Sequence, residues 1–532
     1  MALGDDKHQL IFEELVNVLG EEYVEDDPAV LEAFSRESQT EMYLTRSRCE
    51  FIVLPGSTED IQAILRLANR HQFPCSVTST GLLLLSCFPV KGYDYWCLID
   101  PKRLNHFYID EKNMCAVVEP YVTVAQVQAE AMKIGLFTGV TGAGAQGSAL
   151  ATSLNANSHW TGWRTSKGRN LLGVEWVLPT GDIFQTGTLT VSDDDYSWGD
   201  GPGISALGLL RGNRGPSGTL GVITRAAIKL YPWPGPAVWP TNGVQPEKVS
   251  VLPRDKFRTY IFNFPTMESC IEAVRELGEA EIGGVVMQVN PYEMVCLAAR
   301  SREEFWARWH TEYWQKQIHH GHMLFITLWG FASSKQVDYE EAVLMDIAAD
   351  TGGELIPENE SAWVSDEVQV AAVRDSNRPR YLRLAVTNAI SGSVDSLYDA
   401  LRSIPPGIEV LAKYSPPLGD GGLYDRGQKQ HKFWLADFGR IATVGIGSFG
   451  EKTEECEAVM AKVRPEMSRY CLDNKVFSVG FASEASRNGA HFANIHLLLA
   501  SIKRSLDPMN IANPSRLVDI TKVPETSITG QD

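Results

Sequence analysis

The 532-residue chain has no apolar run long enough to cross a bilayer, since its leucine run at residues 82–85 is far shorter than the roughly 20 residues needed. A signal-peptide pattern is also missing, because Asp5 and Asp6 open a mixed polar segment. An excess of basic residues is missing too, and the formal net charge of -18 opposes nonspecific binding to nucleic acid or anionic membranes. We therefore expect a cytoplasmic protein with no nucleic-acid partner and no transmembrane segment.

Several short motifs are absent. The nine cysteines contain no CxxC pair and no zinc-type spacing, so they suit free thiols in a reducing compartment. No G-x-x-x-x-G-K-S/T occurs, which argues against a P-loop. The two G-x-G-x-x-G strings, at residues 142–147 and 445–450, are not expected to open a helix directly after a strand, which argues against a Rossmann dinucleotide fold. The chain has ample residues for a hydrophobic core, since 44% of them are hydrophobic and 13 are tryptophans. At 532 residues it is too long for a single hydrophobic core. The composition predicts a packed globular protein of at least two domains.

The N-terminal quarter begins with a strand, a helix and a strand. Residues 51–55 are apolar and strand-like, and Ser57 is placed to cap a helix whose apolar side chains share one face. These side chains are Ile61, Ile64, Leu65 and Ala68, and a second strand is expected at residues 75–77.

Further strands are expected at residues 96–99, 107–109 and 116–118, a hairpin at 174–185 and a long strand at 222–230. Thr123 and Gln126 form a capping-box pattern, and the helix that follows should bury Val124, Val127, Ala131 and Ile134. A proline-rich stretch at residues 232–253 indicates an interdomain connection. Beyond it, strands (260–263, 284–289, 324–329) alternate with helices (267–277, 302–315, 339–350), and a final helix is expected at 492–506.

Three loops rich in glycine and hydroxyl side chains could offer backbone N–H groups to a pyrophosphate without any basic pocket. Each alone could be an ordinary tight turn. The candidate residues in them are Thr78, Ser79, Thr80 and Gly81; Thr141, Gly142, Ala143, Gly144, Gln146, Gly147 and Ser148, with Ala149 and Thr152 just after; and Gly218, Gly221, Val222 and Ile223.

The order and spacing of these loops resemble a known family. The segments 53–61, 73–81, 100–110, 117–123, 173–182 and 218–224, with the closing segment 502–514, look like the vanillyl-alcohol oxidase and p-cresol methylhydroxylase superfamily of flavoproteins. The resemblance implies an α+β fold. In it, a two-subdomain FAD-binding domain of the p-cresol methylhydroxylase type (PCMH type) is joined to an α+β cap domain with a large antiparallel sheet.

The same resemblance implies the division of the chain and its cofactor. Residues 1–235 and 487–532 would form the FAD-binding domain, and residues 236–486 the cap over the flavin. The three loops and Arg516 would line FAD, which carries the redox chemistry while the protein supplies position and excludes water. Because the first loop contains no histidine, we expect noncovalent FAD.

Catalytic candidates are fewer. The resemblance would put His159 near the flavin, although a structural histidine is the alternative, and in the cap Arg378, Arg380 and Tyr381 could hold a carboxylate or phenolate. A surface strand edge is the alternative for these three residues. The cluster His319, His320 and His322 could bind a metal by composition, but we favour a solvated junction and expect no metal site.

The resulting hypothesis is an FAD-dependent oxidoreductase. It would remove hydride from a small-molecule substrate, namely an alcohol, a hydroxy acid or a para-substituted phenol, and pass the electrons to an unknown acceptor. Candidate partners are an electron-acceptor protein or a partner subunit. We expect a homo- or hetero-oligomer. Two alternatives stay open. One is a non-redox FAD enzyme resembling alkyl-dihydroxyacetone-phosphate synthase, and the other is a flavin-poor structural or partner subunit of a larger redox complex.

Overall fold

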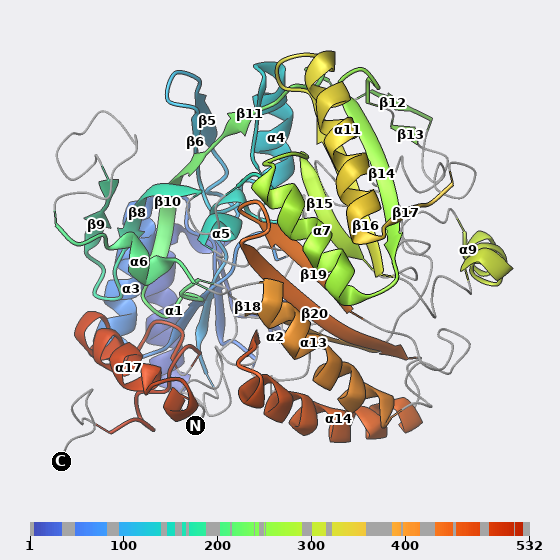
Figure 1. Ribbon diagram of the computed structural model, residues 1–532. Helices are drawn as coiled ribbons and strands as arrows, with labels where there is room; N and C mark the ends of the chain where they lie inside the picture. Colours follow the sequence, from blue (N-terminus) through green and yellow to red (C-terminus); the bar gives the residue numbers. More distant parts are fainter. Residues whose placement is uncertain are drawn as a thin grey trace.

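A computed structural model describes most of the chain and shows an α+β fold (Figure 1). The N-terminal elements and the C-terminal helix lie on one side, and a large sheet with its helices lies on the other. The described residues are 5–34, 48–81, 95–139, 146–154, 162–165, 170–187, 203–212, 215–238, 240–243, 249–250, 252–289, 301–314, 322–357, 386–394, 397–414, 431–450, 454–478, 489–514 and 516–524. Within these ranges no helix is long and apolar enough to span a bilayer.

The first sheet, within the described residues, has four strands in the order β1-β2-β4-β3. Strands β2 (Phe51–Val53), β4 (Cys97–Ile99) and β3 (Cys75–Val77) are parallel, and β1 (Val24–Glu25) joins antiparallel at the edge. Helix α3 (Thr58–His71) makes the crossover and buries the four side chains expected on its inner face. Its N-terminus is capped as predicted, because the Ser57 hydroxyl accepts the Asp60 N–H at 3.1 Å.

The second sheet is antiparallel, and its described strands run in the order β5-β6-β10-β8-β9. The predicted capping box of α4 (Val124–Lys133) is confirmed, but the prediction that Ile134 is buried is wrong, since 39% of this residue is exposed. Helix α4 ends at Lys133, so Ile134 leaves the helical register that buries Val124, Val127 and Ala131. The strands are β5 (Phe107–Asp110), β6 (Cys115–Val118), β10 (Val222–Lys229), β8 (Leu171–Val177) and β9 (Ile183–Gln185).

A buried carboxylate joins the two sheets. Glu175 on β8 accepts hydrogen bonds at 2.7 Å from the hydroxyls of Thr58, which begins α3, and Thr224 on β10. Since a buried carboxylate is costly unless its oxygens are bonded, these two donors fix how α3 sits on the second sheet.

The third sheet is the largest, and among the described residues its order is β17-β14-β16-β15-β19-β20-β18-β21. Helices α7 (Met267–Glu279), α11 (Ser334–Thr351), α13 (Leu397–Ala412) and α14 (Glu454–Asp473) accompany it (Figure 1). We call these strands and helices the large-sheet unit. The strands are β17 (Glu354–Leu355), β14 (Phe257–Phe264), β16 (His322–Trp329), β15 (Val285–Val289), β19 (His431–Ala436), β20 (Ile441–Gly450), β18 (Val386–Val394) and β21 (Phe477–Ser478).

Two helix predictions were too long. Helix α9 covers only Arg302–Trp309, because the Thr311 hydroxyl donates to the Arg308 carbonyl at 2.8 Å and starts a new turn. Helix α17 covers Ile495–Leu506, because its N-cap is Asn494, so residues 492–494 lie outside the helix. The remaining elements are the 15-residue helix α1 (Asp5–Leu19) and several short ones: α2 (Pro28–Phe34), α5 (Ala149–Leu154), α6 (Leu207–Leu210), β7 (Leu136–Phe137), β11 (Tyr231–Pro232), β12 (Thr241–Asn242), β13 (Val249–Ser250), η1 (Glu21–Tyr23) and η6 (Gly489–His491).

The segment after α17 returns to the first sheet. Ala512 pairs in parallel with Cys75 of β3. The Cys75 N–H donates to the Ile511 carbonyl, and the Asn513 N–H donates to the Cys75 carbonyl, each at 2.7 Å. In Figure 1 the red α17 therefore lies beside the blue and teal elements. Ile511 and Ala512 complete the core of the first sheet.

Candidate cofactor site

The carboxyl ends of the parallel strands in the first sheet carry the first glycine-rich loop. Thr78 follows β3 and donates its N–H to the Ile99 carbonyl at 3.0 Å, while Asp100 follows β4. Thr78, Ser79 and Thr80 are half-buried, and Gly81 is exposed with φ +73°. Ligands of open α/β sheets bind outside this edge, so the loop stands where a cofactor is expected.

The third loop packs directly against this edge. Gly218 has φ +72°, and a Cβ there would lie 3.0 Å from the Val77 side chain at the end of β3. Gly221 has φ +109°, and a Cβ there would lie 2.2 Å from the Val177 carbonyl oxygen. Both positions require glycine, because side chains rarely adopt these angles and the space is taken.

The second loop reaches the third through α5. Ser148 pairs with Thr123, and its hydroxyl accepts the Ala151 N–H at 3.1 Å, so this side chain caps α5. At the other end of α5, a Cβ on Gly215 would lie 3.1 Å from the Leu154 side chain. The structure thus joins the second loop to the third and the third to β3, which carries the first.

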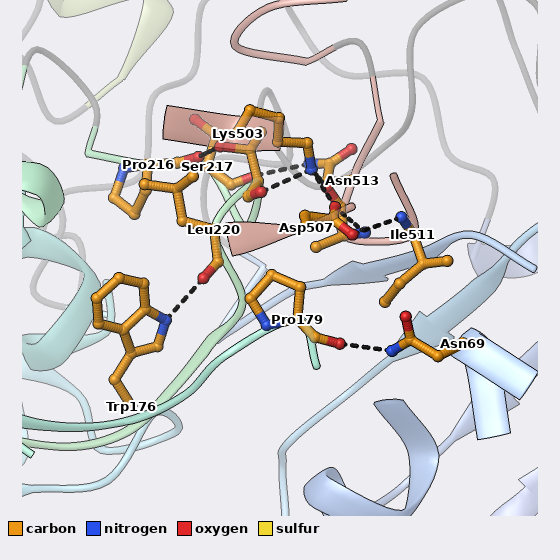
Figure 2. Close-up of polar contacts among 12 residues, drawn as sticks. Asn69, Trp176, Pro179, Pro216, Ser217, Leu220, Lys503, Asp507, Ile511 and Asn513 are labelled. Atoms are coloured by element: carbon orange, nitrogen blue, oxygen red, sulfur yellow. Dashed lines mark hydrogen bonds and ion pairs between the residues drawn. The ribbon is translucent and has the colours of Figure 1, made fainter. Parts of the chain in front are cut away.

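The C-terminal segment fixes this junction with a buried cation (Figure 2). The Lys503 ammonium group donates to the Thr219 carbonyl at 2.7 Å, to the Asp507 carboxylate at 2.5 Å and to the Ala512 carbonyl at 2.5 Å. Burial lowers the pKa of Lys503, and the Asp507 carboxylate beside it opposes that shift. Asp507 also accepts the N–H groups of Ile511 and Ala512, at 3.0 and 2.9 Å.

Asn513 and Arg516 lie on the same segment. The Asn513 amide donates to the Ser217 carbonyl at 2.6 Å, which ties the end of the segment to the third loop. Arg516 is buried, and its backbone N–H donates to the Asn513 carbonyl at 3.4 Å. The predicted cofactor residue Arg516 therefore lies within one turn of the third loop's anchor.

One buried polar atom at the strand edge has no hydrogen-bond partner among the described residues. It is Oδ1 of Asp100, whereas Oδ2 lies 3.8 Å from the Lys102 ammonium group. Burial raises the pKa of Asp100, and burial together with the Asp100 charge raises the pKa of Tyr121. A hydroxyl or amide donor of a bound cofactor would satisfy this oxygen, and FAD carries both in its ribityl chain and flavin ring. The residues at this edge fit FAD.

Some of the other predicted site residues are described by the structure, and the rest are not. Gln146, Gly147, Ala149 and Thr152 lie where the second loop enters α5, and the side chains of Val222 and Ile223 are buried in the cores of the two N-terminal sheets. Outside the described residues lie Thr141, Gly142, Ala143, Gly144, His159, Arg378, Arg380 and Tyr381.

Sequence reasoning assigned no role to Lys503, Asp507, Asn513 or Asp100. The spacing of Lys503 and Asp507 by four residues on a helix was visible, but such pairs usually lie on the surface. Only the return of the chain to β3 buries them.

The histidine cluster is described only in part, since His319 and His320 lie outside the described ranges. His322 begins β16 and is buried. Among the described residues no group of three or more histidine, cysteine, aspartate or glutamate side chains is placed to hold a metal.

Comparison with known proteins agrees with this geometry. Residues 49–187 match the family described as "FAD binding domain". In sequence the chain is similar to glycolate oxidase subunit GlcD of Bacillus subtilis, with 29% identity over 228 residues that cover 42% of this chain and 45% of that protein. The chain spans less than half the length of the first curated relatives it matches.

In structure the chain is similar to p-cresol methylhydroxylase, with a TM-score of 0.74, 17% identity and 98% of each chain covered. It is also similar to alkyldihydroxyacetonephosphate synthase, with a TM-score of 0.61, 16% identity, and 95% of this chain and 84% of that one covered. At such low identity these likenesses show the fold. The fold and the matched domain together define a flavoprotein with an FAD-binding domain, and FAD is its cofactor. Residues 49–187 carry this FAD-binding domain, and the chain as a whole shares the fold of p-cresol methylhydroxylase.

Proposed function

We propose that this protein is an FAD-dependent oxidoreductase that removes hydride from a small alcohol, hydroxy acid or para-substituted phenol. The observation that carries the proposal is the junction at the carboxyl ends of β3 and β4. There the first and third loops meet beside the Asp100 oxygen that has no partner in the described structure. Bound FAD supplies a two-electron acceptor at such a junction.

The chain's own residues would bind and orient this cofactor noncovalently. Backbone N–H groups of residues 78–81 and 142–149 would hold the pyrophosphate, and the third loop with Arg516 would hold the adenine half. Noncovalent attachment is supported by the first loop, which carries hydroxyl side chains and no histidine.

The substrate would bind between the flavin and the large-sheet unit. His159 near the flavin, and Arg378, Arg380 and Tyr381 in the cap, are the proposed substrate-side groups. A guanidinium group pairs well with a carboxylate or phenolate. Residues 1–235 with 487–532 are proposed as the FAD-binding domain and residues 236–486 as the cap. This division is supported by the return of Ala512 to Cys75 and by the Lys503 bond to Thr219.

The two alternatives make different predictions for the same purified protein. A non-redox FAD enzyme is favoured by the likeness to alkyldihydroxyacetonephosphate synthase, and it would be yellow but would not bleach with substrate. A flavin-poor partner subunit would be colourless. The proposed oxidoreductase shows a flavin spectrum that an alcohol, 2-hydroxy acid or 4-alkylphenol bleaches without oxygen.

The attachment of FAD and the need for a metal have their own tests. Acid precipitation should leave FAD in the supernatant, and a yellow pellet would mean a covalent bond. Turnover should survive chelation. Loss of turnover that zinc or manganese restores would assign a metal role to the cluster of His319, His320 and His322.

Location and assembly are proposals as well. The acidic charge and the free buried cysteines in the described residues support a cytoplasmic protein. We also propose a homo- or hetero-oligomer, in which an acceptor protein or a partner subunit receives the electrons. Light scattering of the purified chain, alone and with a candidate acceptor protein, tests this proposal.

A further inference from the structure

A short segment of the N-terminal part is built into the core of the large-sheet unit. Residues 162–165, which we call the insert, lie in the chain between α5 and β8. Trp163 on the insert is 1% exposed and belongs to the same hydrophobic cluster as Val274, Leu277 and Ile282. Its indole N–H donates to the Ile282 carbonyl at 2.8 Å. The core of the large-sheet unit is therefore incomplete without a side chain from the cofactor-binding part.

Backbone hydrogen bonds hold the insert from the opposite side. The Phe438 N–H donates to the Trp163 carbonyl at 2.8 Å, and the Asp437 N–H donates to the Thr165 carbonyl at 3.0 Å. Gly439, with φ +78°, leaves room for the indole, since a Cβ there would lie 3.2 Å from the Trp163 ring. The turn after β19 is thus shaped to receive the insert.

Arg164 adds a charged contact to this packing. Its Nε donates to the Gly283 carbonyl at 2.6 Å, and its Nη2 lies 3.5 Å from the Glu340 carboxylate on α11. The guanidinium group also lies 5.0 Å from the Phe331 ring centroid and 5.6 Å from that of Phe438. The cation is thereby held on several sides by the large-sheet unit.

Glu340 is itself held in place. Its side chain is 5% exposed, and its oxygens accept the Gly283 N–H at 2.9 Å and the Gln336 amide at 2.8 Å. A buried carboxylate with this few solvent contacts needs a countercharge, and Arg164 provides one. Removal of Arg164 leaves the carboxylate inside the large-sheet unit without its cation.

The insert also contacts the chain leading into the second cofactor loop. The Gly162 N–H donates to the Gly139 carbonyl at 2.8 Å, two residues before Thr141. A Cβ on Gly139, with φ +71°, would lie 2.6 Å from the Tyr231 ring, so this approach is tight. One connected set of contacts therefore runs from Glu340 through the insert to the start of the second loop.

We propose that Arg164 is a positioning residue that fixes the second cofactor loop relative to the large-sheet unit through its contact with Glu340. This inference rests on the proposed function, in which the second loop holds the FAD pyrophosphate. Arg164 touches neither cofactor nor substrate in this role. It acts by holding the insert, and with it the backbone at Gly139, in one arrangement.

The test compares Arg164→Met with Arg258→Met, which removes an ion pair confined to the large-sheet unit. Arg258 pairs with Asp338 and Glu341 on α11, the helix that carries Glu340. FAD titration of the apoprotein by fluorescence and amide hydrogen exchange at residues 437–438 are measured. We expect Arg164→Met to bind FAD about tenfold more weakly or worse and to exchange faster at these amides. Arg258→Met should leave both readouts unchanged.

A second variant covers the case in which Arg164→Met does not fold. Glu340→Gln keeps an acceptor for the Gly283 N–H while removing the charge, and it should weaken FAD binding by a smaller factor. Unchanged FAD binding and unchanged exchange in whichever of the two variants folds would overturn the role of Arg164. Absence of FAD binding by the wild-type chain would overturn the proposed function instead, and amide exchange would still test the insert.

Discussion

The Lys503 ammonium group donates to the Thr219 carbonyl at 2.7 Å across 284 residues of sequence. Its second partner, Asp507, stands one helical turn away, and the two side chains are 1% and 0% exposed. A cation that bonds Thr219, Asp507 and Ala512 at once holds the third loop, the C-terminal helix and the edge of the first sheet in one arrangement. This contact ties the C-terminal segment to the third loop of the proposed cofactor site.

Lys503→Met should destabilise the protein strongly, because it leaves the Asp507 carboxylate buried without its cation. Breaking a buried ion pair costs about 3–5 kcal/mol. Urea unfolding measures this loss, and FAD titration should show weaker binding. The matched control is Arg469→Met, which removes an exposed pair of the same spacing with Asp473 and should have a much smaller effect. Equal effects of the two substitutions would contradict the role of Lys503.

Removal of the C-terminal segment tests the proposed domain division. A chain ending at Ala482 lacks Lys503, Asp507 and the residues that pair with β3. We expect it to lose FAD binding and to expose the edge of β3, with aggregation as the result. Flavin content and light scattering of the purified chain are the measurements, and full flavin content in a monodisperse sample would disprove the assignment.

Asp100→Asn should stabilise the apoprotein at neutral pH. Burial raises the pKa of Asp100, so its contribution to stability is fully present below the unfolded pKa and is lost as pH rises through the folded value. An amide stays neutral and avoids this loss. Urea unfolding between about pH 4 and pH 7 should show a flatter pH dependence than in the wild type.

The same substitution is expected to weaken FAD binding, since the carboxylate is the stronger acceptor for a cofactor hydroxyl. Asp110→Asn is a control of opposite sign, because hydrogen bonds from Asn113 lower the pKa of Asp110. Its contribution to stability is present above the unfolded pKa and is lost as pH falls through the folded value. If Asp100→Asn destabilised the apoprotein at neutral pH, the contact of Asp100 with Lys102 would outweigh the cost of burying its charge, and the prediction would be wrong.

Gly221→Ala should be among the most damaging single-methyl additions in this protein. The new Cβ would meet the Val177 carbonyl oxygen at 2.2 Å in a backbone with φ +109°. Gly203→Ala separates the two causes, because Gly203 has φ +85° but nothing within 4 Å of the added Cβ. The melting temperature of Gly221→Ala should be well below that of Gly203→Ala. Similar melting temperatures would show that the close approach of the new Cβ to the Val177 carbonyl oxygen is not important.

Local sequence patterns determined the N-terminal elements. The hydroxyls of Ser57 and Thr123 cap the helices that were predicted, since a cap and an apolar stripe need only nearby residues. The sequence analysis did not predict α13, which holds Pro405 and Pro406, or α14, which holds Pro465. Proline disfavours a helix interior, and packing in the large-sheet unit supports both helices.

The sequence by itself also determined the three loops, their order and the family they resemble, because loop composition and order are local properties of the chain. Only the tertiary structure decided that Lys503 is buried beneath Thr219 and that Trp163 completes the core of the large-sheet unit. Both contacts join residues far apart in the chain. Burial of the apolar ring stabilises the Trp163 contact, whereas the Lys503 contact requires acceptors that replace the water lost on burial. Both depend on which segments the fold brings together.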